Sequence, residues 1–266
     1  KNSKKDIFNR DITKKSILID SVSAYKDGQK TSNYVVNFGG SNSPEVYNNV
    51  VGFRLVNAIV PYTIYTINDH NKNFTITISS TTTQVTLDNG SYTFVQLGNH
   101  LQDKINTAYS STDYTVTNHI TTYKYTIEKN TSPTDFKINW SQFPECARLF
   151  GFEKDTDESN LHSSEHSVDQ SIHYVDLVIN EIPGIACKMS SKGKEVIARI
   201  PFTNVSGGLI NYRAPEGELQ SSNYFFPIKL SSLTIQLFDD NGNEYDSNNG
   251  DNYFEFEISI VNESLI

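Results

Sequence analysis

Four side chains in and just after the acidic segment 153–170 have the chemistry to bind a metal ion: His162, Glu165, His166 and His173. On a helix, His162 and His166 would share one face because they stand four residues apart. The surrounding residues lack the apolar periodicity of a helix, however, and a metal site needs three or four fixed ligands. The sequence therefore predicts solvated loop histidines and no metal site.

A second polar segment loosely resembles a calcium-binding loop, with oxygen-bearing side chains at Asp239, Asn241, Asn243 and Asp246. Such a loop has glycine at its sixth position and a bidentate glutamate at its twelfth. Counted from Asp239, the glycine here is Gly242 and the twelfth residue is Gly250. The pattern predicts a tight turn without a metal.

No pattern of residues points to catalysis. The carboxylates Asp155, Asp157 and Glu158 lie in a polar segment with no hydrophobic setting to raise a pKa. The glycine-rich, zinc-protease and serine-hydrolase motifs are absent, and Gly193-Lys194 is read as a turn between strands. A triad assembled from distant segments stays open, but no residue indicates one. We expect a protein that is not an enzyme, with no catalytic residue, no cofactor and no metal.

Two cysteines, Cys146 and Cys187, stand in separate segments without metal-binding spacing. They are expected to be reduced, buried thiols, so the chain is not a small domain held by disulfides.

Most of the chain alternates between apolar and polar residues over short runs bounded by turn-forming residues, a pattern typical of strands. The expected strands cover 16–21, 33–38, 49–67, 73–79, 83–88, 113–119, 122–129, 135–140, 174–180, 194–202, 228–240 and 252–261. Segments 153–170 and 203–223 are expected to be an exposed loop and a long connection. Many short strands with turn signals favour a sandwich or barrel.

Two helical segments are expected. Residues 93–109 place Phe94, Leu97, Leu101 and Ile105 at spacings of three and four, which indicates an amphipathic helix that Thr93 can cap. A short helical turn should follow Pro144 and end at Gly151.

The most apolar strand should end at Pro61, because proline cannot donate to a sheet ladder. Within it, Phe53, Leu55 and Ile59 alternate with polar or smaller residues, which places these three side chains on one face.

The charge is distributed unevenly along the chain. The formal net charge is −9, so direct binding of nucleic acid by the main body is not expected. Residues 1–15 are basic by contrast and are interpreted as an extended N-terminal arm, read either as a solubilising tail or as a contact to an acidic partner or membrane. The remaining residues, 16–266, are predicted to form a single domain.

Several segments together resemble the single jelly-roll penton and minor capsid proteins of nucleocytoplasmic large DNA viruses and their virophage relatives. The segments that carry the resemblance are "SILIDS" (16–21), "VGFRLVNAIVPYTIYTI" (51–67), "NGSYTFVQLGNHLQDKIN" (89–106), "CARLFGF" (146–152) and "LTIQLFDDNGNEYDSNNGDNYFEFEI" (233–258). Their order and spacing, more than any single motif, make the likeness specific to this lineage.

The resemblance implies an all-β fold, a single jelly-roll β-sandwich with elaborated loops and one or two helices. It implies a structural capsid protein of the virion, assembled in the host cytoplasm, and most specifically the penton protein that forms a pentamer at the fivefold vertices of an icosahedral giant virus. Its partners would be its own copies, the neighbouring trimers of major capsid protein, and the inner membrane or internal minor capsid proteins through the arm.

Two alternatives to the penton stay open. The family's usual Pro-Pro-Ile-Arg segment is only echoed by "FFPIKL" (225–230), so a minor capsid or cement protein of the same lineage fits as well. A carbohydrate-binding jelly-roll attachment module would use Tyr, Asn and Asp side chains in loops such as 203–223.

Overall fold

The chain folds into two compact units. In the computed structural model, the described residues are 12–24, 26–39, 45–131, 135–169, 172–204, 206–215 and 224–262. Unit 1 comprises residues 1–63 and 172–266, and unit 2 is the continuous segment 64–171. The expected single domain over 16–266 is therefore corrected to two units, because segment 64–171 encloses a hydrophobic core of its own.

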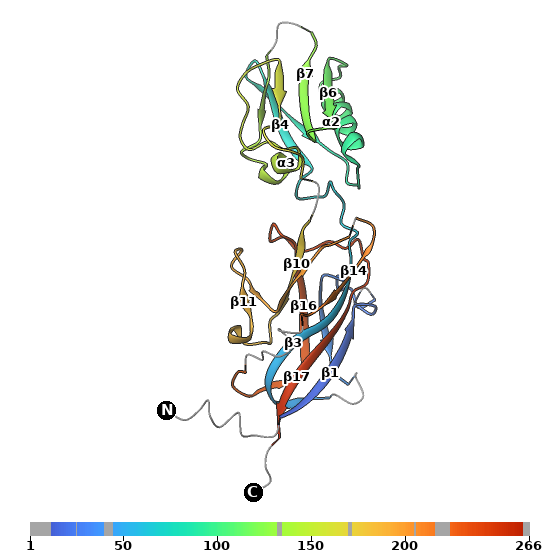
Figure 1. Cartoon of the computed structure of the whole chain (residues 1–266). Helices are drawn as coiled ribbons and strands as arrows, with labels where there is room; N and C mark the ends of the chain where they lie inside the picture. Colours follow the sequence, from blue (N-terminus) through green and yellow to red (C-terminus); the bar gives the residue numbers. More distant parts are fainter. Residues whose placement is uncertain are drawn as a thin grey trace, which may run out of the picture. The chain divides into compact units, whose positions relative to one another are not determined.

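Unit 1 is built from two antiparallel sheets (Figure 1). The first sheet has, in order, β1 (Ile12–Asp20), β17 (Tyr253–Val261), β3 (Tyr47–Pro61) and β14 (Leu209–Arg213), and β15 (Ile228–Leu230) also pairs with β3. The second sheet has β13 (Ala198–Pro201), β10 (Tyr174–Ile179), β16 (Ser232–Phe238) and β2 (Asn33–Asn37).

The order of these strands is that of a jelly roll. When the eight main strands of unit 1 are counted along the chain, the first sheet runs first, eighth, third, sixth, and the second runs fifth, fourth, seventh, second. Every pairing is antiparallel, and the two sheets form the paired Greek keys of the jelly roll. The all-β jelly-roll prediction is confirmed, and unit 2 is inserted between its third and fourth strands.

Unit 2 contains two three-stranded sheets and two helices. One sheet orders β5 (Thr81–Thr86), β4 (Asn73–Ile78) and β8 (Lys137–Asn139), and the other orders β6 (Tyr114–His119), β7 (Lys124–Lys129) and β9 (Leu161–Ser163). The helices are α2 (Phe94–Ala108) and α3 (Pro144–Leu149). No helix in the described segments of the chain is both long and apolar enough to cross a membrane.

Helix α2 follows the sequence pattern closely. Thr93 caps it in a capping box, in which the Thr93 side chain accepts from the backbone of Gln96 while the Gln96 side chain accepts from the backbone of Thr93. Its apolar stripe, Leu97, Leu101 and Ile105, is fully buried. The predicted amphipathic helix is confirmed.

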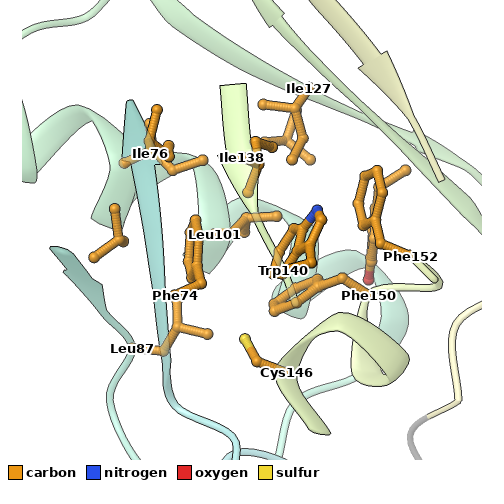
Figure 2. Packing of buried hydrophobic residues seen from close by; sticks show 14 of the residues in the cluster. Phe74, Ile76, Leu87, Leu101, Ile127, Ile138, Trp140, Cys146, Phe150 and Phe152 are labelled. Atoms are coloured by element: carbon orange, nitrogen blue, oxygen red, sulfur yellow. The ribbon is translucent and has the colours of Figure 1, made fainter. Parts of the chain in front are cut away.

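The core of unit 2 is rich in aromatic rings. The ring of Trp140, the chain's one tryptophan, stacks on Phe74 at 5.0 Å and on Phe152 at 4.9 Å between ring centroids (Figure 2). Helix α3 adds Cys146 to this cluster, which is separate from the sandwich core of unit 1. Unit 2 therefore stabilises itself with its own buried apolar surface.

The predicted boundary between the N-terminal arm and the first strand is wrong. Strand β1 begins at Ile12, so the arm is shorter than 1–15. Lys14 pairs with Glu257 of β17 at 3.1 Å, and Lys15 pairs with Glu45 at 2.7 Å, so both lysines belong to the strand. The rest of the predicted arm, residues 1–11, lies outside the described residues.

The two segments expected to be irregular each contain a strand. Strand β9 lies within 153–170 and adds to β7, and strand β14 lies within 203–223 and adds to β3. Both strands are short, with three and five residues, so partners distant in sequence stabilise them more than local periodicity does. The remaining short elements, η1 (Gly184–Ala186), β11 (Lys188–Met189) and β12 (Glu195–Val196), form a hairpin region in unit 1.

Candidate interaction surface

The four candidate metal ligands do not come together. His162 lies in β9 and is buried, and its Nε2 donates to the backbone oxygen of Phe136 at 2.9 Å. Burial lowers the pKa of His162, which favours the neutral ring. His166 is exposed beside Glu153, and His173 contacts Asp240 in unit 1. The expectation of a solvated loop histidine is thus wrong for His162.

Among the described residues, no group of three or more His, Cys, Asp or Glu side chains is placed to hold a metal ion. The segment that resembles a calcium loop forms the predicted tight turn. The backbone amides of Asn241 and Asn243 each donate to Asp239 Oδ1 at 2.9 Å, and Gly242 adopts a positive φ of 90°. The carboxylate that would face a cation is therefore bonded to its own loop.

The remaining candidate polar groups have structural environments. Asp155 accepts from the amide and the hydroxyl of Ser141, and these contacts lower its pKa although burial opposes them. The Gly193-Lys194 segment is the predicted turn, closed by the Gly193 amide donating to Ser190. Cys146 is a buried free thiol whose pKa burial raises, and Cys187 is a partly exposed free thiol.

The outer face of the first sheet carries an unusual row of apolar side chains. In β1, Ile17 and Ile19 point into the core while Leu18 between them is 80% exposed. Tyr253 of β17 and Ile59 of β3 lie opposite each other on the same outer face. Together with Asp20, Asn57 and Glu255 they line a groove, named here the sheet groove.

A β-bulge explains why sequence alternation misplaced Ile59. Along β3, Leu55 pairs with Phe256 and Asn57 pairs with Glu255, so Val56 is the extra residue of the bulge. Before the bulge, the odd-numbered Phe53 and Leu55 point inward. Beyond the bulge the alternation is reversed, so that Ala58 points inward and Ile59 points outward. The predicted shared face of Phe53, Leu55 and Ile59 is therefore wrong, and the bulge adds a large apolar residue to the sheet groove.

The rim of the sheet groove is acidic. Asp20 and Glu255 form no ion pair with any residue in the described ranges, and their oxygens accept from Val22 N and from the Asn57 and Ser16 side chains. Farther along the same face, Glu257 is instead neutralised by Arg54 at 2.7 Å and Lys14 at 3.1 Å. The same sheet face thus has an ion-paired end and an apolar end with free negative charge.

Part of the outer face of the second sheet is in contact with the 184–196 hairpin, defined here as η1, β11, β12 and their turn. Asp176 and Phe238 pair on that outer face, and Lys194 Nζ lies 3.6 Å from the Phe238 ring centroid. Val196 of the hairpin is buried, whereas Met189 is 69% exposed. The hairpin therefore lies on the sandwich with one side and presents the other side to solvent.

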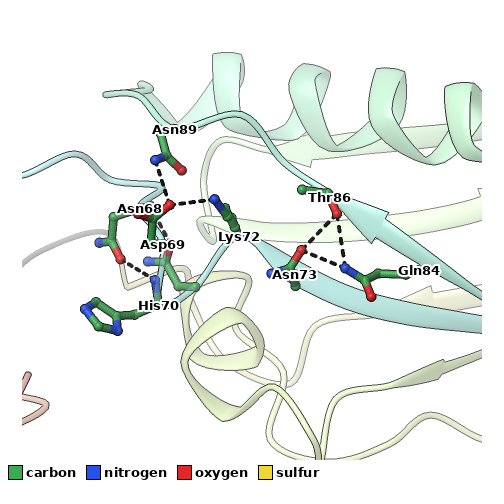
Figure 3. A network of polar contacts seen from close by, with 9 residues as sticks. Asn68, Asp69, His70, Lys72, Asn73, Gln84, Thr86 and Asn89 are labelled. Carbon is green, nitrogen blue, oxygen red and sulfur yellow. Dashed lines mark hydrogen bonds and ion pairs between the residues drawn. The ribbon is translucent and has the colours of Figure 1, made fainter.

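Unit 2 has a sheet face of a different kind. One face of the β5-β4-β8 sheet carries a row of amide and hydroxyl groups, with the single charged residue Lys137 opposite Thr77: Asn73, Thr75, Thr77, Thr82, Gln84, Thr86 and Asn139. Asn73 Oδ1 accepts from Gln84 at 3.1 Å and from Thr86 at 2.8 Å (Figure 3). This polar ladder continues at its other end through Thr77 and Thr82, whose hydroxyls are 2.9 Å apart.

Loop residues beside this ladder are tied by one carboxylate. Asp69 accepts from Lys72 and Asn89, and both contacts lower its pKa (Figure 3). The loop that leads into β4 is thereby held against the segment that precedes α2.

Comparisons with known proteins give a family but no activity. A family model described as "Family of unknown function (DUF5901)" matches residues 16–218. No curated protein matches the chain. Among solved structures, the chain is similar to the crystal structure of SeMet-labeled mavirus penton protein, with 10% sequence identity and a TM-score of 0.47. The match covers 94% of this chain and 99% of that one.

Proposed function

This chain belongs to the family of unknown function DUF5901, and we propose that it is a structural protein of a viral capsid. The observation that carries the proposal is the strand order of unit 1, which is that of an eight-stranded jelly roll, an architecture found in viral capsid and lectin domains. A sandwich of this kind satisfies most of its backbone internally and leaves its faces and loops free for neighbours.

The motifs that resemble capsid proteins of large DNA viruses support the same proposal, because each lies in a structural element. Segment 51–67 contains most of β3, segment 89–106 contains most of α2, and segment 233–258 spans the β16 and β17 strands. The resemblance therefore rests on residues that form both units, including the central strand of the first sheet.

The finer proposal is a penton protein, located in the virion and assembled in the host cytoplasm. Five copies would close into a ring at each fivefold vertex and contact the neighbouring trimers of major capsid protein. Residues 1–11 would contact the inner membrane or internal minor capsid proteins. The role is structural, without enzymatic activity and without direct contact to nucleic acid. The exposed apolar groove of unit 1 supports self-association, since large exposed apolar patches mark interaction sites.

The test is the oligomeric state of the purified full chain, followed by its position in intact particles. Native mass spectrometry should show a pentamer, and a map of virions should show density for this chain at the vertices only. Density between capsomers away from the vertices would indicate the minor capsid or cement protein instead. A chain absent from purified particles would overturn the capsid proposal.

A carbohydrate-binding module remains the second candidate, and the Asn, Thr and Gln side chains on one face of unit 2 favour it because amide and hydroxyl groups suit sugar hydroxyls. A glycan array with the full chain tests this function. Signal that is lost in Thr75→Val but kept in Thr121→Val, an exposed threonine outside the face, would support it. The absence of signal on the array would reject it.

A further inference from the structure

We propose that the sheet groove of one copy receives the 184–196 hairpin of a second copy, and that this contact builds the ring. This inference rests on the proposed capsid function and names the two surfaces that self-association would use. The groove belongs to the first sheet and the hairpin contacts the outer face of the second sheet at Phe238, so the two surfaces lie on opposite sides of one sandwich. Figure 1 shows β11 beyond β10 and β16 on the side away from β1.

The two surfaces match in apolar character. The groove offers Leu18, Ile59 and Tyr253, each at least 36% exposed. The hairpin offers Ile185 and Met189, which are 66% and 69% exposed. Burying large apolar side chains of such exposure against each other lowers the free energy of association. Methionine also adapts readily to an irregular surface.

The two surfaces also match in charge. The groove is rimmed by Asp20 and Glu255, neither of which pairs with a cation in the described parts of the chain. The hairpin carries three lysines, Lys188, Lys192 and Lys194, and one acid, Glu195, which pairs with Met189 on the exposed side, so its formal charge is three minus one, or +2. Opposite potentials of this kind steer association and disfavour a groove-to-groove contact, which would bring the acids of two copies together.

The hairpin is held in shape before it binds. Ser190 donates its amide to Lys194, Gly193 donates to Ser190, and the positive φ of Gly193 closes the turn. The Lys194 ammonium over Phe238 fixes the hairpin to the sandwich. Little ordering is needed on association, which lowers the entropic cost of the contact.

The placement of the two surfaces determines the kind of assembly. A contact between two different patches is heterologous and runs head to tail, and it closes into a ring when the rotation between neighbours divides a full turn. A contact between two copies of one patch would stop at a dimer. The groove and hairpin thus provide the heterologous kind of contact from which a ring is built.

The experiment measures the concentration at which the full chain dissociates, by sedimentation velocity and native mass spectrometry. Leu18→Thr in the groove and Met189→Thr in the hairpin should each raise that concentration roughly tenfold or more. Ile120→Thr, an equally exposed apolar position in unit 2, is the matched control and should change nothing. Circular dichroism should show that all three variants remain folded, since each side chain is exposed.

Charge-reversal variants provide a second test of the contact between groove and hairpin. Asp20→Lys and Lys192→Glu should each weaken association, and the double variant should recover it at least in part, whereas Lys154→Glu should have no effect. Unchanged assembly of both threonine variants would overturn the inference while leaving a pentameric capsid protein possible through other surfaces. If association were weakened by the groove variants but not by the hairpin variants, the groove would bind a different segment, and the inference would also be overturned. A wild-type chain that never self-associates would reject the pentamer together with the groove contact.

Discussion

Units 1 and 2 differ in what their sheets present to solvent. The first sheet of unit 1 exposes Leu18, Ile59 and Tyr253 side by side, whereas the exposed face of the β5-β4-β8 sheet in unit 2 is a ladder of mutually bonded amides and hydroxyls. Unit 2 also exposes Ile120 and Tyr123 at the β6–β7 turn and Leu161 in the short strand β9, but not side by side on the β5-β4-β8 sheet. Unit 1 thus exposes the apolar surface on which the proposed self-association rests, whereas this face of unit 2 is polar.

The two units also differ in their cores, and a spectroscopic probe separates them. Trp140 is the single tryptophan of the chain and lies in the core of unit 2. Its fluorescence reports the unfolding of unit 2, while far-ultraviolet circular dichroism reports both units. The predictions below use this difference.

The largest effect is expected from Leu101→Asp in unit 2. Leu101 is fully buried, and a buried carboxylate without a partner costs several kcal/mol, comparable to the roughly 5–15 kcal/mol stability of a domain. The variant should lose the emission of buried Trp140 under native conditions while much of the β signal of unit 1 persists. Leu161→Asp, at a half-exposed position of β9, is the control. A normally melting Leu101→Asp protein would show that α2 does not hold the core.

Phe256→Ala in unit 1 should have the next largest effect. The ring is buried between the two sheets and contacts Phe53 and Phe254, so its truncation should cost about 3–5 kcal/mol. Urea unfolding followed by circular dichroism should show a weakened transition, while the Trp140 transition stays near its wild-type midpoint. Phe226→Ala, whose ring is 81% exposed, should leave both transitions unchanged. An equal shift of the Trp140 transition would mean that the two units unfold together.

Acid should destabilise unit 2 before unit 1. Burial lowers the pKa of His162 and of His100, so each contributes stability that is complete above about pH 6.5 and declines as the pH falls through that value toward the lowered pKa. In unit 1, burial opposes ionisation of Glu257, but the bonds from Arg54 and Lys14 outweigh it and lower its pKa. Its contribution is present above about pH 4.3 and is lost only as the pH falls through the lowered pKa.

The measurement is the urea midpoint of each unit between pH 7 and pH 5. The loss in unit 2 is limited to about 1.4 kcal/mol per pH unit for each histidine. His162→Gln should reduce the pH dependence of the urea midpoint that Trp140 fluorescence reports. His70→Gln, at an exposed position, should leave that pH dependence unchanged. If the pH dependence of the urea midpoint of unit 2 were unchanged in His162→Gln, buried His162 would not be a source of the acid sensitivity.

The smallest effect is expected at the start of α2. Thr93→Ala removes the hydroxyl that accepts from the Gln96 amide and should destabilise unit 2 by about 1 kcal/mol. Thr93→Ser should retain most of the capping, and Thr121→Ala serves as the surface control. A Thr93→Ala variant as stable as wild type, by Trp140 fluorescence, would show that the capping box contributes little.

Local sequence patterns were sufficient for the elements whose stability is mostly local. The spacing of Leu97, Leu101 and Ile105 and the cap at Thr93 gave α2 to within one residue at each end, because both signals act within a few turns of helix. Alternation likewise located the long strands, and Pro61 ended β3 as expected. The resemblance to jelly-roll capsid proteins added the fold class, which the strand order of unit 1 confirms.

Contacts between distant residues determined the rest. Strand β1 pairs with β17 from Ile12 to Asp20 across more than two hundred residues, so the start of the strand depends on a partner that local composition does not show. The burial of His162 depends on β9 adding to β7, and the outward position of Ile59 depends on a bulge opposite Glu255 and Phe256. The sequence by itself determined the alternation, the helix and the charges. Only the tertiary structure divided the chain into two units and assembled the sheet groove, because pairing register and bulges arise between strands and not within them.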